Sequence, residues 1–158
     1  MSDSSAPLAP ALGKISSGLY VVTAVVGGFP VGMLCSFVEQ ASFAPPMVTL
    51  AIAPGRPLSP ALEPGGYIGL HVLSKANQPL MKSFARGSSP ESFASHELLP
   101  QEHGIPRFAE AWVFLACRVA GSLPAGDHRV YLAQVLEGTV QHEGAEPMIR
   151  TRANGFSY

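Results

Sequence analysis

The sequence predicts a mainly β protein, a closed or nearly closed β-barrel with two or three helices at its periphery. Three observations lead to this prediction: apolar runs of strand length occur along the chain, glycine and proline turns separate them, and helical periodicity is confined to short segments. The chain of 158 residues is long enough for one core. We therefore expect a single domain over residues 8–158, preceded by a flexible N-terminus at residues 1–7.

The first predicted elements are a short helix and a pair of strands. The apolar residues of the helix recur at helical spacing: Leu8, Leu12 and Ile15. Residues 19–26 are apolar at almost every position, as in a strand whose two faces are both covered. Residues 27–30, Gly-Gly-Phe-Pro, predict a turn. The uncharged stretch 18–38 is therefore predicted to be a buried hairpin and not a membrane span.

Residues 32–53 predict the wall of a pocket. We interpret them as a strand, a polar bend, a stop at Pro45-Pro46 and a second strand at residues 47–53. Small polar residues stand between large apolar ones in this stretch: Cys35, Ser36 and Ser42. Such a wall lets a flat ligand approach the backbone closely while the aliphatic side chains exclude water.

Residues 56–66 predict an anion site. Ser59 is a favourable helix N-cap, Pro60 suits the first helical position, and Pro64-Gly65-Gly66 ends the helical turn. The N–H groups at the start of this turn and the guanidinium of Arg56 can converge on a phosphate. The alternative is that Ser59 only caps the turn and Arg56 only lies on the surface.

The segment after this site predicts a strand, a helix and a loop. Residues 67–73 predict the strand, and Ser74 predicts the start of the helix. One face of the helix is apolar and consists of Leu80, Met81, Phe84 and Ala85. Residues 87–103 predict a surface loop with a helical turn near residues 92–96. At the end of the chain, residues 147–158 are expected to dock as an edge strand or an arm.

The last third of the chain predicts two long strands, at residues 112–123 and 130–141. A glycine turn, Gly126, places Asp127 and His128 at the mouth between these strands. The imidazole can donate to a bound ligand there or stabilise negative charge. The alternative is an ordinary hairpin turn with an exposed histidine.

Composition and motifs exclude several classes of function. The net charge of -1 provides no basic excess for nucleic acid or an anionic membrane. Charged residues make up 13%, about half the usual share, so we expect a partner subunit to cover apolar surface. The chain has no Gly-x-Ser-x-Gly elbow of a serine hydrolase, and its histidines and two cysteines lack metal-ligand spacing, so no metal is expected. The N-terminus lacks the pattern of a signal peptide, and a cytoplasmic location is expected.

Several segments together resemble a known family. They are residues 12–23, 40–46, 78–84, 117–119 and 126–128, and they follow one another in the family's order. The chain resembles the flavin reductase-like family with its FMN-binding split barrel, and particularly the C-terminal flavin reductase module of cyanobacterial diflavin flavoproteins. The resemblance covers nearly the whole chain from Leu12 onward.

This resemblance implies a homodimer of split, Greek-key-like β-barrels that binds one FMN per subunit near the dimer interface. It implies that the isoalloxazine ring lies against the backbone of Leu34, Cys35, Ser36 and Phe37. It implies contacts of Ala41 and Ser42 with the polar edge or the ribityl chain, and of Arg56, Ser59 and Lys82 with the phosphate. His128 corresponds to the histidine that approaches the nicotinamide or the flavin face.

The expected function is that of an FMN-dependent oxidoreductase of the flavin reductase type. NADH or NADPH would pass a hydride to flavin N5, and the electrons would go on to a second flavin, to oxygen or to a metal complex. The sequence has no Gly-x-Gly-x-x-Gly fingerprint, so the nicotinamide is expected to bind transiently above the flavin. The alternative is a non-catalytic FMN-binding module that receives electrons from a protein partner. An oxidase of the pyridoxine-phosphate type is disfavoured because its motifs are absent.

Overall fold

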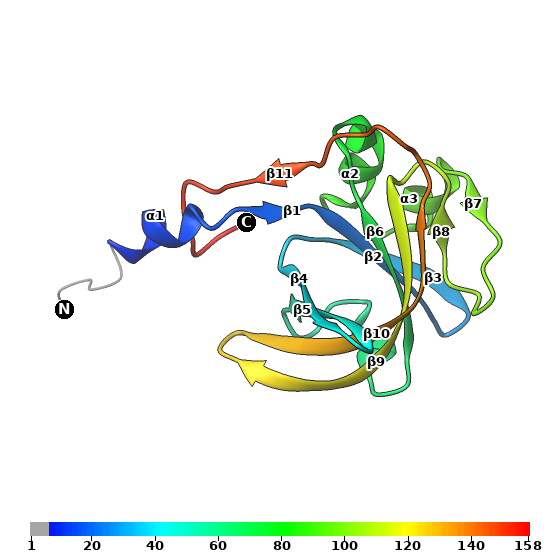
Figure 1. Ribbon diagram of the computed structural model, residues 1–158, viewed down its shortest axis with the longest axis horizontal. Helices are drawn as coiled ribbons and strands as arrows, with labels where there is room; N and C mark the ends of the chain where they lie inside the picture. The colour runs from blue at the N-terminus through cyan, green and yellow to red at the C-terminus, as the bar shows by residue number, and fades with distance from the viewer. Residues whose placement is uncertain (1–6) are drawn as a thin grey trace.

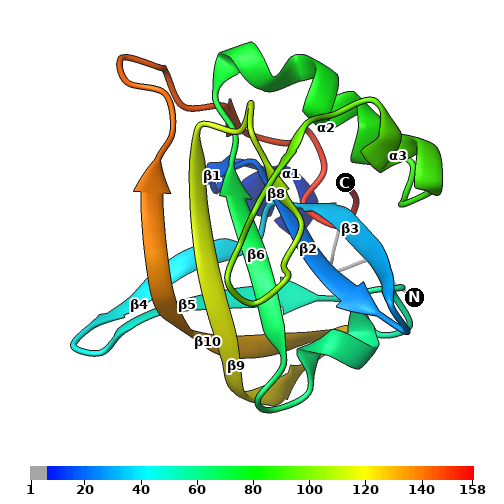
Figure 2. The same ribbon diagram turned by 90° about the vertical axis from the view of Figure 1, so that its right-hand side faces the viewer.

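The computed structural model describes residues 7–158, and its main element is a seven-stranded antiparallel sheet that curls into a barrel (Figures 1 and 2). The sheet order is β3-β2-β6-β9-β10-β5-β4. The strands are β2 (Tyr20–Val26), β3 (Phe29–Cys35), β4 (Val38–Phe43), β5 (Pro46–Ile52), β6 (Tyr67–Val72), β9 (Val113–Ala125) and β10 (His128–Val140). The expectation for residues 1–7 falls outside the described residues, apart from Pro7.

The two edge strands of this sheet, β3 and β4, follow each other in the chain. Only Ser36 and Phe37 connect them, and they are not hydrogen-bonded neighbours in the sheet. The barrel is therefore split at this point, which leaves one side of β3 without a paired strand. The mainly β architecture predicted from the sequence is confirmed.

An arm projects from the barrel and contains both ends of the described chain (Figure 1). It consists of α1 (Leu8–Gly13), β1 (Ser17–Gly18) and β11 (Ile149–Arg150), and β1 pairs antiparallel with β11. The Arg152 N–H donates to the Gly13 carbonyl over 2.8 Å, which ties the C-terminal segment to α1. The short N-terminal helix and the docked tail are both confirmed.

Short helices cover one side of the barrel (Figure 2). They are η2 (Lys75–Asn77), α2 (Gln78–Phe84) and α3 (Pro90–Ala94), and a small sheet of β7 (Leu98–Leu99) and β8 (Arg107–Phe108) follows. Leu80 and Phe84 are buried, and the Phe84 ring lies 5.2 Å from Phe93 and 5.5 Å from Phe108. The predicted apolar face of α2 is confirmed for Leu80, Phe84 and the partly buried Met81, whereas Ala85 is exposed just after the helix. No helix among residues 7–158 has the length and hydropathy needed to span a membrane.

Strand β2 separates two apolar clusters, which explains its nearly unbroken apolar sequence. Val22 belongs to the cluster inside the barrel, whereas Val21 belongs to the cluster beneath α2 and α3. Successive side chains of a strand point to opposite faces, so both faces of β2 must be apolar. The predicted double coverage of this strand is confirmed.

The structure corrects the prediction for residues 38–46 in two respects. The residues interpreted as a polar bend form β4, which pairs with β5 and contains a register shift between Gln40 and Ser42. Pro46 does not end the pairing, because it lies opposite Phe43 at the start of β5. Polar residues are tolerated in β4 because an edge strand is covered on one side only.

The turn before β3 is also shorter than predicted. Gly27 and Gly28 alone make the connection, with φ of 59° and 82°. Such left-handed conformations suit glycine in two-residue hairpins. Phe29 and Pro30 therefore belong to β3, where the edge position tolerates a proline.

Candidate functional site

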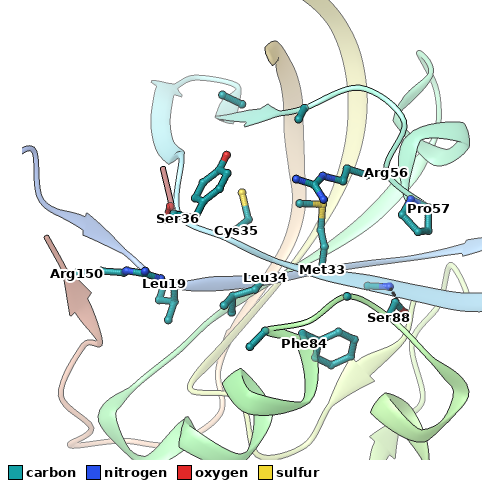
Figure 3. Close-up of a pocket in the computed structure, with 16 residues that line it drawn as sticks. Leu19, Met33, Leu34, Cys35, Ser36, Arg56, Pro57, Phe84, Ser88 and Arg150 are labelled. Atoms are coloured by element: carbon teal, nitrogen blue, oxygen red, sulfur yellow. Dashed lines mark hydrogen bonds between the residues drawn. The ribbon is translucent and has the colours of Figure 1, made fainter. Parts of the chain in front are cut away.

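The split edge of the barrel borders a cavity of about 400 Å³ (Figure 3). Strand β3 contributes one wall, from Gly32 to Cys35, and Ser36 continues it. The end of α2 and the loop after it contribute Phe84 and Ser88, as Figure 3 shows. A volume of this size lies within the range typical of cofactor sites.

The β3 wall can offer backbone hydrogen bonds to a flat ligand. The Gly32 N–H donates to the Ser88 hydroxyl oxygen over 3.1 Å, so this peptide faces away from β2. Backbone groups alternate in direction along an edge strand, and the N–H and C=O of Leu34 therefore face the same side. The wall combines these polar groups with apolar side chains.

Cys35 acts as a small apolar residue in this wall. Its side chain is buried, and burial raises the pKa of the thiol to about 11. The thiol is protonated at neutral pH and is therefore a poor nucleophile. Burial likewise raises the pKa of Cys117 to about 12, so both cysteines lie inside as small hydrophobic residues.

Two arginines give the cavity a positive character. Arg56 lies in the loop after β5, Arg150 lies on β11, and Figure 3 shows them approaching from opposite ends of the β3 wall. None of the described lining residues is acidic. A guanidinium fork matches the geometry of phosphate oxygens, so the cavity can hold an anion.

A neighbouring cavity of about 350 Å³ contains the predicted histidine. The Nδ1 of His128 lies 2.7 Å from the Asp127 carboxylate, and its Nε2 lies 2.5 Å from the hydroxyl of Tyr158. The ring of Phe37 lies 5.7 Å from the rings of both His128 and Tyr158. Tyr158 lines this cavity and the larger one, so the two sites adjoin.

The chemistry of its two partners assigns the hydrogen bonds of His128. The hydrogen bond from His128 lowers the pKa of Asp127, so the carboxylate is anionic and accepts from Nδ1–H. Burial raises the pKa of Tyr158, so the phenol keeps its proton at neutral pH. When the imidazole is neutral, its Nε2 is an acceptor, and the Tyr158 hydroxyl donates to it.

The predicted site residues fall into three groups in the structure. Those that line the larger cavity, as predicted for a ligand site, are Leu34, Cys35, Ser36 and Arg56. Those that line the adjoining cavity are Phe37 and His128. Those outside the lining of both cavities are Ala41, Ser42, Ser59 and Lys82.

Ser59 does not cap a helix, contrary to the prediction. It is the first residue of η1 (Ser59–Leu62), the N-cap position belongs to Leu58, and the Ser59 hydroxyl is buried without a partner. The buried side chains of Leu58 and Leu62 anchor this turn in the barrel core, so packing sets its start.

The other three residues outside the two cavities are Ala41, Ser42 and Lys82, and their places in the fold explain this. Ala41 and Ser42 lie at the register shift of the β4–β5 hairpin, and β4 is at the opposite edge of the sheet from β3. Lys82 is exposed on α2 because Leu80 and Phe84 take the buried face of this helix. A role of these residues in flavin binding stays a prediction.

Three residues of the site were not predicted from the sequence: Ser88, Arg150 and Tyr158. The tail was expected to dock, but nothing local shows where. The pairing of β11 with β1 and the contact with α1 place the tail beside β3. The tail contains arginines and aromatic residues in a chain with few charges, and this composition was the only sign in the sequence that it could contribute to a site.

Outside the two cavities, Ser83, His96 and Glu110 contact one another and hold neighbouring segments together. Ser83 Oγ lies 2.8 Å from His96 Nε2, and His96 Nδ1 contacts Glu110. The Ser83 hydroxyl also donates to the Pro79 carbonyl of its own helix over 3.1 Å. These contacts fasten α2 to the segment after α3.

Comparison with known proteins decides the family. The model of the flavin reductase like domain matches residues 12–155, which is most of the chain. The chain belongs to the flavin reductase-like domain family. Diflavin flavoprotein A 1 of Synechocystis sp. strain PCC 6803 is 37% identical over 154 residues, covering 96% of this chain and 27% of that protein. This flavin reductase-like domain thus spans about a quarter of the length of the curated relatives it matches.

Solved structures share the fold of this flavin reductase-like domain. A homolog of nitrilotriacetate monooxygenase component B from Mycobacterium thermoresistibile superposes with a TM-score of 0.83 at 23% identity, over 94% of this chain and 83% of that one. An NADH:FAD oxidoreductase from Streptomyces globisporus, solved with NAD and FAD fragments, gives 0.79 at 24% identity, over 90% and 85%. The split barrel predicted from the resemblance is the fold of these neighbours.

Proposed function

We propose that this flavin reductase-like domain is an FMN-dependent oxidoreductase that takes a hydride from NADH or NADPH. The electrons would pass to a second flavin, to oxygen or to a metal complex. One observation carries the proposal: the unpaired edge of β3 borders a cavity that has an arginine at each end and adjoins His128.

The residues of the larger cavity fit FMN. A flat ring can lie along the β3 wall, where the backbone of Leu34 offers hydrogen bonds and Met33 offers an apolar surface. The guanidinium of Arg56 can hold a phosphate, and Arg150 adds a second positive charge. FMN, when bound, supplies the two-electron chemistry that no protein side chain provides.

In this proposal the chain's own residues bind and orient the FMN and the electron donor, and they prevent side reactions. Backbone N–H groups of β3 stabilise negative charge that develops beside them. The protonated Cys35 does not attack bound ligands. Asp127 keeps the His128 proton on Nδ1, which leaves Nε2 to accept a hydrogen bond from the electron donor.

The visible spectrum of the purified protein tests the proposal. We expect a yellow protein, or a colourless one that takes up FMN, and anaerobic NADH or NADPH should bleach it within minutes. Binding of FMN without bleaching would favour the alternative function, a non-catalytic module that receives electrons from a protein partner. A protein that cannot bind FMN would contradict both.

Arg56→Ala tests the phosphate end of the site. We expect FMN to bind about 10- to 100-fold more weakly, because a charge-assisted hydrogen bond contributes roughly 1.5–3 kcal/mol. Arg118→Ala is the matched control, since Arg118 is exposed on β9 and does not line the cavity. Fluorescence titration of FMN measures both variants, and equal loss of affinity in the two would contradict the assignment.

We also propose that the domain works as a homodimer. Large apolar side chains are exposed on the hairpins and on the arm, including Phe43 at 88%, Phe29 at 74% and Ile149 at 67% exposure. A second subunit that covers them would remove this apolar surface from water. Light scattering after size exclusion should give twice the chain mass, and Phe43→Glu should reduce it toward the monomer.

A further inference from the structure

Tyr158 separates the two cavities of the site. Its ring lines both the cavity of about 400 Å³ beside β3 and the cavity of about 350 Å³ that holds His128. Its hydroxyl lies 2.5 Å from His128 Nε2. The proposed function leaves this residue without a role, although it contacts the side chain expected to meet the electron donor.

The hydrogen bond from Tyr158 uses the acceptor that a donor molecule would need. Nδ1 of His128 is already committed to Asp127, so Nε2 is its remaining hydrogen-bonding atom. A neutral imidazole accepts one hydrogen bond at Nε2. Tyr158 and a ligand N–H cannot both occupy this position.

The side chain of Tyr158 has few contacts, although the backbone before it is bound to α1, where the Gly155 N–H donates to the Ala9 carbonyl over 2.6 Å. Arg152 places its guanidinium 5.1 Å from the centre of the Phe37 ring and donates to the carbonyls of Gly155 and Ser157 over 3.4 and 3.3 Å. Tyr158 itself is 61% exposed and touches Phe37 on one side. Movement of its side chain therefore breaks little besides the bond to His128.

We propose that Tyr158 competes with the electron donor for Nε2 of His128 and thereby sets the affinity of the site for nicotinamide dinucleotides. The inference rests on the proposed function, because it takes a nicotinamide as the ligand. A carboxamide suits the position, since its NH₂ group donates to Nε2 as the phenol does. Tyr158 is thus a residue that determines donor affinity.

The same geometry predicts which ring substituent the site accepts. A carboxylate in place of the carboxamide has no N–H to donate to Nε2. NAD⁺ should therefore bind more tightly than nicotinic acid adenine dinucleotide. His128→Ala should remove most of this difference.

The test compares Tyr158→Phe with Ser157→Ala, each of which removes one hydroxyl from the tail. Calorimetry of the FMN-loaded proteins measures the binding of NAD⁺, which donates no hydride, and a separate titration measures FMN. Loss of the competing hydrogen bond should tighten NAD⁺ binding about fivefold in Tyr158→Phe. Tyr158→Phe keeps the ring that lines the larger cavity, so FMN affinity should change far less than NAD⁺ affinity. Ser157→Ala should bind NAD⁺ like the wild type.

The outcomes separate this inference from the proposed function. Unchanged or weaker NAD⁺ binding by Tyr158→Phe overturns the competition, even when NADH bleaches the wild type. Tighter binding supports it, even when no bleaching occurs and the reductase function fails. An equal gain in the His128→Ala background overturns it as well, because the effect would then not pass through Nε2. Failure of both the wild type and Tyr158→Phe to bind NAD⁺ also overturns the competition.

Discussion

Three histidines among the described residues have both ring nitrogens paired, and two of them, His71 and His128, differ in the nature of their partners. His71 lies on β6 with its side chain fully buried, and both of its partners are backbone groups: the Val21 carbonyl at 3.0 Å and the Phe108 N–H at 3.1 Å. His128 is 16% exposed at the cavity, and its partners are the side chains of Asp127 and Tyr158.

The difference shows how one residue type serves stability in one place and binding in another. Backbone partners cannot leave without unfolding strands, so they fix His71 as part of the core. Side chains can exchange their partners at the cost of a rotation. His128 can therefore change partners when a ligand arrives, whereas His71 cannot.

Replacement of each histidine by alanine should give the largest contrast. His71→Ala removes packing against Phe108 and Phe114 and leaves two buried backbone groups unpaired, which should cost roughly 3–4 kcal/mol of unfolding free energy. His128→Ala should cost less than about 1 kcal/mol. Denaturant unfolding measures both, and similar losses would contradict the distinction.

Acid should weaken the fold through His71. Burial lowers the pKa of His71 from 6.5 to about 4. Between these pH values the unfolded chain binds a proton at His71 and the folded chain does not. Stability should fall by about 3 kcal/mol as pH drops from 6.5 to 4, because each pH step of one between the unfolded and folded pKa values removes about 1.4 kcal/mol.

The control for this prediction is the pH dependence of a His71 variant. The acid-dependent loss of stability should be mostly absent in His71→Gln. An unchanged slope in His71→Gln would mean that other groups cause the acid sensitivity. Denaturant unfolding at a series of pH values provides the comparison.

His128→Ala should affect function more than stability, opposite to His71→Ala. We expect anaerobic reduction of FMN by NADH to slow by about 10- to 100-fold, because the donor loses its hydrogen-bond partner. FMN should remain bound, since His128 does not line the larger cavity. His103→Ala is the control, because His103 is exposed and stacks on Tyr67. Release of FMN from His128→Ala would assign this residue to cofactor binding instead.

Asp127→Asn should give the smallest effect and sharpen the role of the carboxylate. Asparagine keeps a hydrogen-bond acceptor for Nδ1–H and loses the charge, and Asp127 is 94% exposed. We expect reduction to slow by about threefold, with a smaller effect at higher salt, because exposed charges are screened. Stopped-flow reduction at two salt concentrations checks this, and a loss as large as that of His128→Ala would contradict the minor role of the charge.

Most strands were predictable because their sequences match a local pattern. The double coverage of β2 and the long pair β9 and β10 follow from apolar periodicity alone. The β4 strand was missed because an edge strand with exposed polar residues has no such pattern. Ser59 was misassigned because a favourable capping residue was judged without the core packing of its neighbours Leu58 and Leu62.

The amino-acid sequence by itself determined most of the strands, the apolar pocket wall at residues 32–36, the arginine after β5 and the turn that presents His128. These features depend on neighbours in the chain, whose chemistry can be read directly. Only the tertiary structure decided that Arg150 and Tyr158 join them, because the β1–β11 pairing brings the tail back over a long span of chain. Such a contact depends on the register between distant segments, which no local pattern encodes.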